Sequence, residues 1–315
     1  MTLLLVPEEI ILYGLIFAIV VIIIFYFLIY YQLSSLPDTI VNTLASKYDN
    51  PCNLQFSLEY REKIYVPRKN GIYEKKLAIA LLDTCFMTSS ANCTAILPIE
   101  NPPGFTNQQQ LNGIDPVTKQ NLFIGYIFWN QDTGNVIFCY SGSESLAAWK
   151  ADFRYHQVPP PDLNGYKDGM LVHQGFYEFY SAIRNQLWCW WEENSKWVKH
   201  LFIIGHSLGA SLASLCAFDF NGVFKEHKKP IVYTFGSPRL ANVEFAKEYD
   251  RKMPHSINVV NTEDLIPALV LAQLFDYTYE TLGQLTPFIK SGGSLSYNHI
   301  DSYYYNLPEE PECAK

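Results

Sequence analysis

The 315-residue sequence has little charge: only 17% of its residues are Asp, Glu, Lys or Arg, and its formal net charge is −8. No stretch of the chain is rich in lysine and arginine. Binding to the phosphate backbone of a nucleic acid depends on clustered basic residues. The sequence therefore predicts no nucleic-acid partner.

The seven cysteines form neither a C-x-x-C pair nor a Cys/His pattern with zinc-type spacing. We therefore expect no zinc site and no disulfide scaffold. The sequence does not decide whether a single disulfide forms among Cys52, Cys85 and Cys93. Cys139 and Cys216 lie within apolar runs, where a cysteine usually behaves as a small buried hydrophobe.

Basic residues are also missing from the start of the chain, where residues 1–9 include Glu8 and Glu9 but no Lys or Arg. Residues 10–31, IILYGLIFAIVVIIIFYFLIYY, carry no charge and match the ~20 residues that a helix needs to cross a bilayer. A cleaved signal peptide usually has a basic start and an apolar region of about 7–15 residues. A buried core helix is the other alternative. The sequence predicts an N-terminal tail over residues 1–9 and a transmembrane anchor over residues 10–31, with the membrane as partner.

The side of the membrane on which the rest of the chain lies stays open. Lys47 is the nearest basic residue after the apolar segment, and a basic flank favours the cytosolic side. The triplet Asn92-Cys93-Thr94 is an acceptor pattern for N-glycosylation, which requires a lumenal side. We therefore expect a single-pass membrane protein of undetermined orientation.

After the anchor, residues 32–121 mix polar stretches with turn residues and are predicted to form a linker and lead-in region. Residues 122–315 are predicted to form the main domain, because short apolar runs alternate there with helical patterns. Ligands in such sheets bind at the carboxyl ends of the strands. The expected strands lie at 122–129, 135–142, 200–207, 230–237 and 256–264, and the expected helices at 172–192 and 208–220.

Gly205-His206-Ser207-Leu208-Gly209 is a G-x-S-x-G match that follows an apolar strand and precedes a small-residue helix. A sharp turn between a strand and a helix exposes a serine hydroxyl beside a base, and the helix N-terminus directs N–H groups at an oxyanion. A helix N-cap serine is the alternative interpretation. The context predicts that Ser207 is a nucleophile.

In folds that place a catalytic serine on such a strand–turn–helix, the acid and then the histidine follow later in the chain. Within the run 256–264, the strand itself is expected over 257–261, so Glu263 and Asp264 lie just past its end, and we choose Asp264 as the acid. His299 is the only histidine after it. His299 is predicted to take the proton from Ser207 and return it to the leaving alcohol.

Several segments between about residues 123 and 305 resemble, in order, the class 3 lipase family, which includes filamentous-fungal triacylglycerol lipases and related feruloyl esterases. One departure concerns Tyr303, the aromatic residue after His299, which comes one position later than the family pattern. The matching segments are YSGSES (140–145), VHQGFYEFY (172–180), GHSLGAS (205–211), YTFGSPRLAN (233–242) and VNTEDLIPAL (260–269).

The resemblance implies that Ser143 supplies an oxyanion donor together with the backbone N–H of Leu208. It also implies a short lid over residues 145–156 that carries Trp149, for which core packing is the alternative. Preorganised donors at an oxyanion contribute several kcal/mol to catalysis. The implied fold is an α/β-hydrolase fold, a mostly parallel sheet flanked by helices, here preceded by one transmembrane helix.

These patterns together predict a membrane-anchored serine ester hydrolase of the lipase type. It is expected to cleave acyl esters of lipids through an acyl-serine intermediate, without a metal or an organic cofactor. Phospholipid hydrolysis or acyl transfer would use the same three residues. A catalytically inactive hydrolase fold that serves as a lipid-binding or scaffolding module is the alternative from another class.

Overall fold

The computed structural model describes residues 58–94, 99–114, 119–142, 155–223, 229–274 and 276–310. The predicted tail and anchor over residues 1–31 lie outside these ranges. None of the helices within them combines the length and the apolar character that a membrane span requires.

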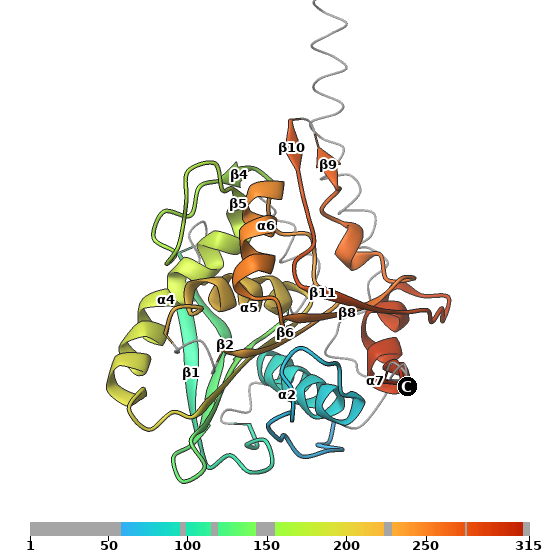
Figure 1. Cartoon of the computed structure of the whole chain (residues 1–315). Helices are drawn as coiled ribbons and strands as arrows, with labels where there is room; N and C mark the ends of the chain where they lie inside the picture. The colour runs from blue at the N-terminus through green and yellow to red at the C-terminus, as the bar shows by residue number, and fades with distance from the viewer. Residues whose placement is uncertain are drawn as a thin grey trace, which may run out of the picture.

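The described residues form one seven-stranded sheet in the order β1-β2-β3-β6-β7-β8-β11 (Figure 1). Neighbours are antiparallel from β1 to β3 and parallel from β3 to β11, which confirms the predicted mostly parallel sheet. The sheet strands are β1 (Asn107–Ile114), β2 (Asn121–Asn130), β3 (Asn135–Tyr140), β6 (His200–His206), β7 (Ile231–Phe235), β8 (Ile257–Asn261) and β11 (Gln284–Phe288). Two short pairs lie outside the sheet: β4 (Gln157–Val158) with β5 (Val172–His173), and β9 (Gln273–Leu274) with β10 (Tyr277–Thr278).

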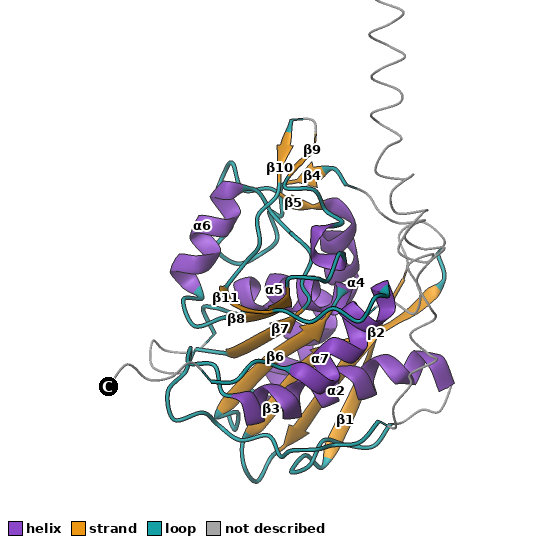
Figure 2. Cartoon of the chain, turned by 90° about the vertical axis from the view of Figure 1, so that its right-hand side faces the viewer, coloured by secondary structure: helices purple, strands orange, loops and turns teal. Residues whose placement is uncertain are grey.

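Helices cover both faces of this sheet (Figure 2). One face carries α4 (Gln174–Asn194), α5 (Leu208–Asp219) and α6 (Val243–Lys252), and the other carries α2 (Lys75–Thr94) and α7 (Ser302–Asn306). A 3₁₀ turn, η1 (Ile266–Ala268), follows β8, and a π-helical turn, η2 (Tyr297–Asp301), leads into α7.

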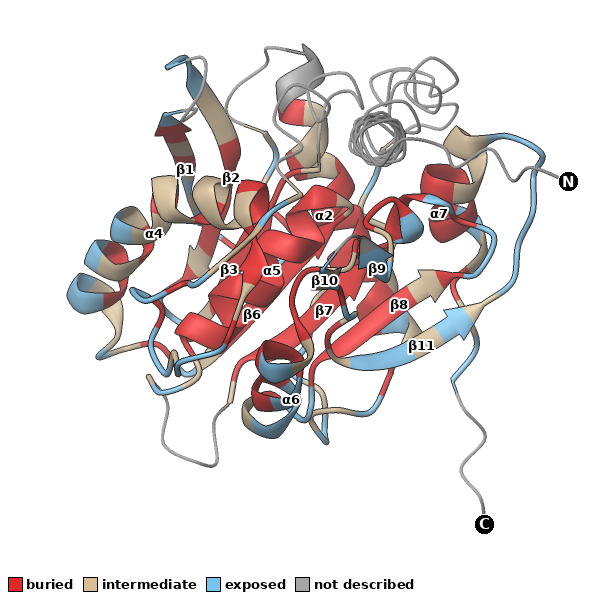
Figure 3. Cartoon of the chain, turned by 90° about the horizontal axis from the view of Figure 1, so that it is seen from above, coloured by how far each residue is buried: buried red, intermediate tan, exposed pale blue. Residues whose placement is uncertain are grey.

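The alternation of side chains along the central strands produces two separate apolar cores. In β6, Leu201 and Ile203 pack toward α4 and α5, whereas Phe202 and Ile204 pack toward α2. Successive side chains of a strand point to opposite faces, so a strand covered on both sides is apolar at every position. Figure 3 shows the result, with α5, β6 and β7 buried at the centre of the molecule.

The predicted lead-in region contributes two elements to this fold, α2 and β1. Helix α2 buries side chains against the sheet, and its sequence has weak helical periodicity because Asp83, Thr84 and Thr88 are buried beside its apolar residues. Strand β1 is rich in Gln and Asn and has only Leu111 and Gly113 buried. It forms a strand because β2 satisfies its backbone hydrogen bonds, a contribution that the side-chain pattern does not reveal.

Cys85, Cys139 and Cys216 are buried with free thiols. The expectation that Cys139 and Cys216 behave as buried hydrophobes is confirmed. Cys85 does not form the disulfide that the sequence left open.

A buried ion pair fixes α2 to the chain segment before it and to α7. Asp83 is fully buried on α2, and its carboxylate accepts hydrogen bonds from the backbone N–H (2.9 Å) and Nε (3.0 Å) of Arg61. The Arg61 guanidinium also donates to the carbonyl of Tyr304 and lies 3.6 Å from the centre of the Tyr304 ring. Burial raises the pKa of Asp83, and the hydrogen bonds from Arg61 oppose that shift.

We expect Arg61→Ala to lower the free energy of unfolding by about 3–5 kcal/mol, because it leaves a buried carboxylate without its partner. Urea unfolding followed by tryptophan fluorescence measures this change. The matched control is Lys75→Ala, which removes an ion pair with the exposed Glu309 and should cost less than about 1 kcal/mol. Equal losses in the two variants would contradict the account.

Candidate active site

Ser207 forms the turn between β6 and α5, with φ of 59° and ψ of −129°. A non-glycine residue with positive φ is uncommon and costs on the order of 1–3 kcal/mol, which the surrounding structure must offset. The backbone N–H of Ser207 donates to the carbonyl of Phe235 on β7 at 2.9 Å, and its carbonyl accepts from Ala210. The serine is thereby held at the N-terminus of α5.

Gly205 and Gly209 let the chain make this turn because both lie against backbone atoms. A Cβ added to Gly205 would lie 2.1 Å from the carbonyl oxygen of Gly209. A Cβ added to Gly209 would lie 2.4 Å from the carbonyl oxygen of Tyr140 at the end of β3. Neither contact can be relieved by a side-chain movement, so the turn requires glycine at both positions.

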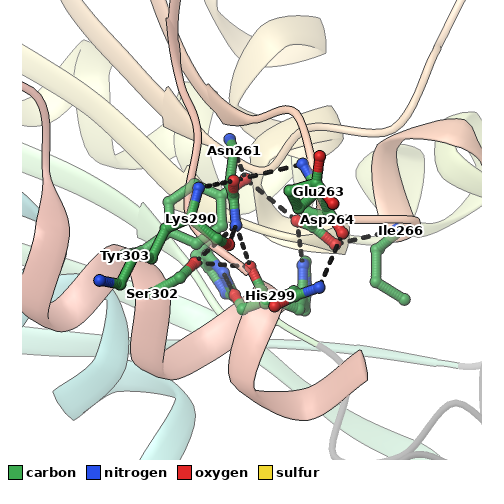
Figure 4. Close-up of polar contacts among 10 residues, drawn as sticks. Asn261, Glu263, Asp264, Ile266, Lys290, His299, Ser302 and Tyr303 are labelled. Carbon is green, nitrogen blue, oxygen red and sulfur yellow. Dashed lines mark hydrogen bonds and ion pairs between the residues drawn. The ribbon is translucent and has the colours of Figure 1, made fainter. Parts of the chain in front are cut away.

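Asp264 lies after the carboxyl end of β8, and its buried carboxylate is held by three hydrogen bonds (Figure 4). Oδ2 accepts from Nδ1 of His299 at 2.7 Å and from the hydroxyl of Tyr303 at 3.0 Å. Oδ1 accepts from the backbone N–H of Ile266 at 2.9 Å. The neighbouring Glu263 is exposed to solvent.

His299 lies on η2 and is buried against the turn that carries Ser207. Its ring centre is 4.5 Å from that of His206. A Cβ added to Gly236, the residue after Phe235, would lie 3.2 Å from Cε1 of His299 and 3.2 Å from Oδ2 of Asp264. The structure thus brings Asp264 and His299 into direct contact beside the carboxyl ends of β6 and β7.

His206 ties the serine turn to the histidine segment. Its Nε2 lies 2.8 Å from the carbonyl oxygen of His299, and burial lowers the pKa of His206 well below its ordinary value, with His299 as a second cause. A carbonyl oxygen only accepts, so the neutral ring of His206 carries its proton on Nε2 and donates it. His299 is therefore held through its ring by Asp264 and through its main chain by His206.

Tyr303 follows the π-helical turn η2, which carries His299. A π turn accommodates one extra residue within a helix, and such turns are frequent at functional sites. The Tyr303 hydroxyl donates to Asp264 and accepts from the backbone N–H of Asn261 at 3.0 Å. Burial raises the pKa of Tyr303 well above its ordinary value, so the phenol stays protonated and donates to the carboxylate.

Asn261, the last residue of β8, connects the loops around the acid (Figure 4). Its amide nitrogen donates to the carbonyls of Lys290 (2.8 Å) and Asn298 (3.1 Å). Its Oδ1 accepts from the backbone N–H groups of Glu263 (3.2 Å) and Lys290 (3.0 Å). A fully buried side chain with these partners fixes the acid loop relative to η2.

Of the oxyanion donors implied by the resemblance, Leu208 is the first residue of α5, and Ser143 lies outside the described residues, as does Trp149 of the implied lid. Gly142, the last described residue before Ser143, lies beside Ser207. A Cβ added to Gly142 would lie 3.5 Å from Cβ of Ser207 and 3.3 Å from the carbonyl oxygen of His206.

Four residues of this site have no counterpart among the sequence predictions: His206, Asn261, Tyr303 as a partner of the acid, and Ser89 on α2. A signal was available for His206, which stands inside the glycine motif, and for Tyr303, which follows the histidine. Asn261 ends a predicted strand, where a buried amide has no distinguishing pattern. Ser89 belongs to the lead-in region, and its contact with Gly142 (3.0 Å) depends on how α2 packs.

Residues 137–274 match the family model described as Lipase (class 3). Among curated relatives, the secreted mono- and diacylglycerol lipase A of Penicillium cyclopium is 30% identical over 154 residues, 48% of this chain and 48% of its own length. Phospholipase A1-II 5 of Oryza sativa subsp. indica is 41% identical over 214 residues, 55% of this chain and 45% of its own length. The chain thus matches less than half the length of these two relatives.

Solved lipases share the fold. Lipase II from Rhizopus niveus superposes with a TM-score of 0.52 at 17% identity, covering 72% of this chain and 85% of that one. Lip2 lipase from Yarrowia lipolytica gives a TM-score of 0.51 at 17% identity, covering 71% and 83%. The match of residues 137–274 to the family model confirms the resemblance to the class 3 lipases, and the solved structures show that the chain shares their fold.

Proposed function

We propose that this protein is a serine ester hydrolase that cleaves acyl esters of lipids. The observation that carries the proposal is the arrangement of three groups at one edge of the sheet. Ser207 stands on a turn with positive φ at the N-terminus of α5, and the buried His299–Asp264 pair lies against that turn. A nucleophile, a base and a group that orients the base are the requirements of acyl transfer through serine.

The reaction follows from the charges of these groups. The hydroxyl oxygen of Ser207 attacks the ester carbonyl carbon while Nε2 of His299 takes the hydroxyl proton. Asp264 accepts from Nδ1 of His299, which directs Nε2 toward the serine and stabilises the imidazolium that forms. The tetrahedral intermediate then expels the alcohol, which receives its proton from His299. Water hydrolyses the acyl-serine by the same route.

The negative charge that develops on the carbonyl oxygen needs donors in place before the reaction. The N-terminus of α5 supplies backbone N–H groups beside Ser207, with Leu208 as the first of them. Ser143 is the second donor in this proposal, on the grounds of the family resemblance and of the position of Gly142 next to Ser207. Trp149 is assigned to a lid over the acyl site on the resemblance alone.

Glycerolipid esters are the substrate class that we propose. The relatives named above are a mono- and diacylglycerol lipase and a phospholipase A1, and both names describe enzymes that act on acyl glycerols. The substrates in these two names differ in head group, and the shape of the binding pocket decides which head group an enzyme accepts. Acyl transfer to an alcohol would use the same three residues with an alcohol in place of water, and an inactive lipid-binding module would retain only the fold.

We expect Ser207→Ala to abolish hydrolysis of p-nitrophenyl esters, with a loss of about 10⁴-fold or more in kcat, since no other group can take over the attack. The matched control is Ser291→Ala, an exposed serine in the loop before η2, which should retain wild-type activity. A comparison of short and long acyl chains in the same assay reports the preferred substrate. Equal activity in wild type and Ser207→Ala would refute the serine mechanism. A folded wild-type protein without activity would favour the binding module.

We also propose that residues 10–31 anchor the protein in a membrane, because their length and lack of charge suit a transmembrane helix. Tethering raises the local concentration of an enzyme at its lipid substrate. The full chain should therefore hydrolyse lipid in bilayer vesicles faster than a folded fragment of residues 32–315, while both hydrolyse a soluble ester equally. Equal rates on vesicles would contradict the anchor.

A further inference from the structure

A hydroxyl on α2 holds the backbone that leads to the predicted oxyanion donor. The N–H of Gly142 donates to the side-chain oxygen of Ser89 at 3.0 Å. Gly142 is also the residue closest along the described chain to Ser143, and it lies against Ser207 and the carbonyl of His206. The contact therefore connects a helix outside the family match to the centre of the site.

Two other bonds act on the same stretch of backbone. The N–H of Ser141 donates to the carbonyl of Ile124 on β2 at 2.9 Å, and the hydroxyl of Ser141 donates to the carbonyl of Gly142 at 2.8 Å. The first belongs to the sheet and the second is local. The bond to Ser89 connects Gly142 to α2, on the other face of the sheet from α5.

The position of Ser89 is itself set by α2. Three residues earlier, Phe86 packs edge-on against the ring of His206, with ring centres 5.1 Å apart. Another three residues earlier, Asp83 is bound by Arg61. Residues three apart on a helix lie on the same side, so one side of α2 contacts the serine turn and Gly142 together. A shift of α2 along the sheet would break both contacts.

We propose that Ser89 is a positioning residue for ester hydrolysis, which holds the backbone of Gly142 in place beside Ser207. The inference rests on the proposed function of Ser207. Oxyanion donors act because they are in place before charge develops, and small displacements of such groups reduce the rate sharply. Ser89 acts through Gly142 and does not touch the substrate, so its removal should slow the chemical step and leave substrate binding unchanged.

The test compares Ser89→Ala with Ser90→Ala in the full chain, assayed with a short-chain p-nitrophenyl ester. Ser90 is the next residue of α2, and its hydroxyl donates within the helix to the carbonyl of Met87 at 2.8 Å. We expect Ser89→Ala to lower kcat by about 10-fold with KM within about twofold, less than the loss of a direct oxyanion donor. Ser90→Ala should retain the wild-type kcat. Ser89→Thr, which keeps the hydroxyl, should restore most of it.

A second readout separates positioning from a general structural effect. An alkyl trifluoromethyl ketone forms a tetrahedral adduct with a reactive serine, so its inhibition constant should rise in Ser89→Ala by the same factor by which kcat falls. Wild-type kcat in Ser89→Ala, or a rise in KM at constant kcat, would overturn the proposal. If Ser89→Ala does not fold, Ser89→Cys replaces it, because a thiol has nearly the same shape but is a weaker acceptor. An unchanged kcat in Ser89→Cys would also overturn the inference.

The failure of this inference can be told apart from the failure of the proposed function. An active wild type with an equally active Ser89→Ala contradicts the role of Ser89 alone. A folded wild type without esterase activity contradicts the proposed function, and this inference falls with it.

Discussion

The hydrogen bond between Asp264 and His299 is the interaction on which the rest of the site depends. Both side chains are buried, and a charged carboxylate is tolerated there only because donors surround it. His299, Tyr303 and the backbone of Ile266 supply those donors. The same bonds hold the imidazole ring against the serine turn, so the contacts that stabilise the buried carboxylate also fix the ring of the proposed base.

Ser207 comes from a different part of the sheet than Asp264 and His299. Backbone contacts hold the serine turn next to this pair. His206 bonds to the main chain of His299, and Ser207 is bonded to β7 next to Gly236, which lies against both members of the pair. The positive φ of Ser207 has an energetic cost that only a rigid surrounding can offset. Close packing of α5 on β3, which excludes any side chain at Gly209, provides that rigidity.

Sequence patterns predicted the central strands β3, β6, β7 and β8 because these strands are buried on both faces and therefore largely apolar. The runs around β3, β6 and β7 have the length and the apolar character of buried strands. The choice of Asp264 and His299 followed from the chain order that is typical of folds with a serine on such a turn. The side-chain pattern did not predict helix α2, because α2 buries polar groups whose partners lie elsewhere in the chain. It did not predict strand β1, because β1 is stabilised by its pairing with β2. The roles of Asn261 and Ser89 were not predicted for a related reason. A hydrogen bond between residues far apart in the chain leaves no local pattern in the sequence. The catalytic assignment of the three residues, with Ser143 and Leu208 as oxyanion donors, stays a prediction.

The central claim is that His299 and Asp264 activate Ser207, and reaction with a fluorophosphonate probe tests it most directly, because the probe requires an activated serine but no particular acyl chain. The full chain would be treated with the probe and the modified peptide identified by mass spectrometry, with His299→Ala as the variant that removes the base. We predict modification of Ser207 in the wild type and its loss in His299→Ala. Modification at another serine, or equal labelling of Ser207 in both proteins, would contradict the account.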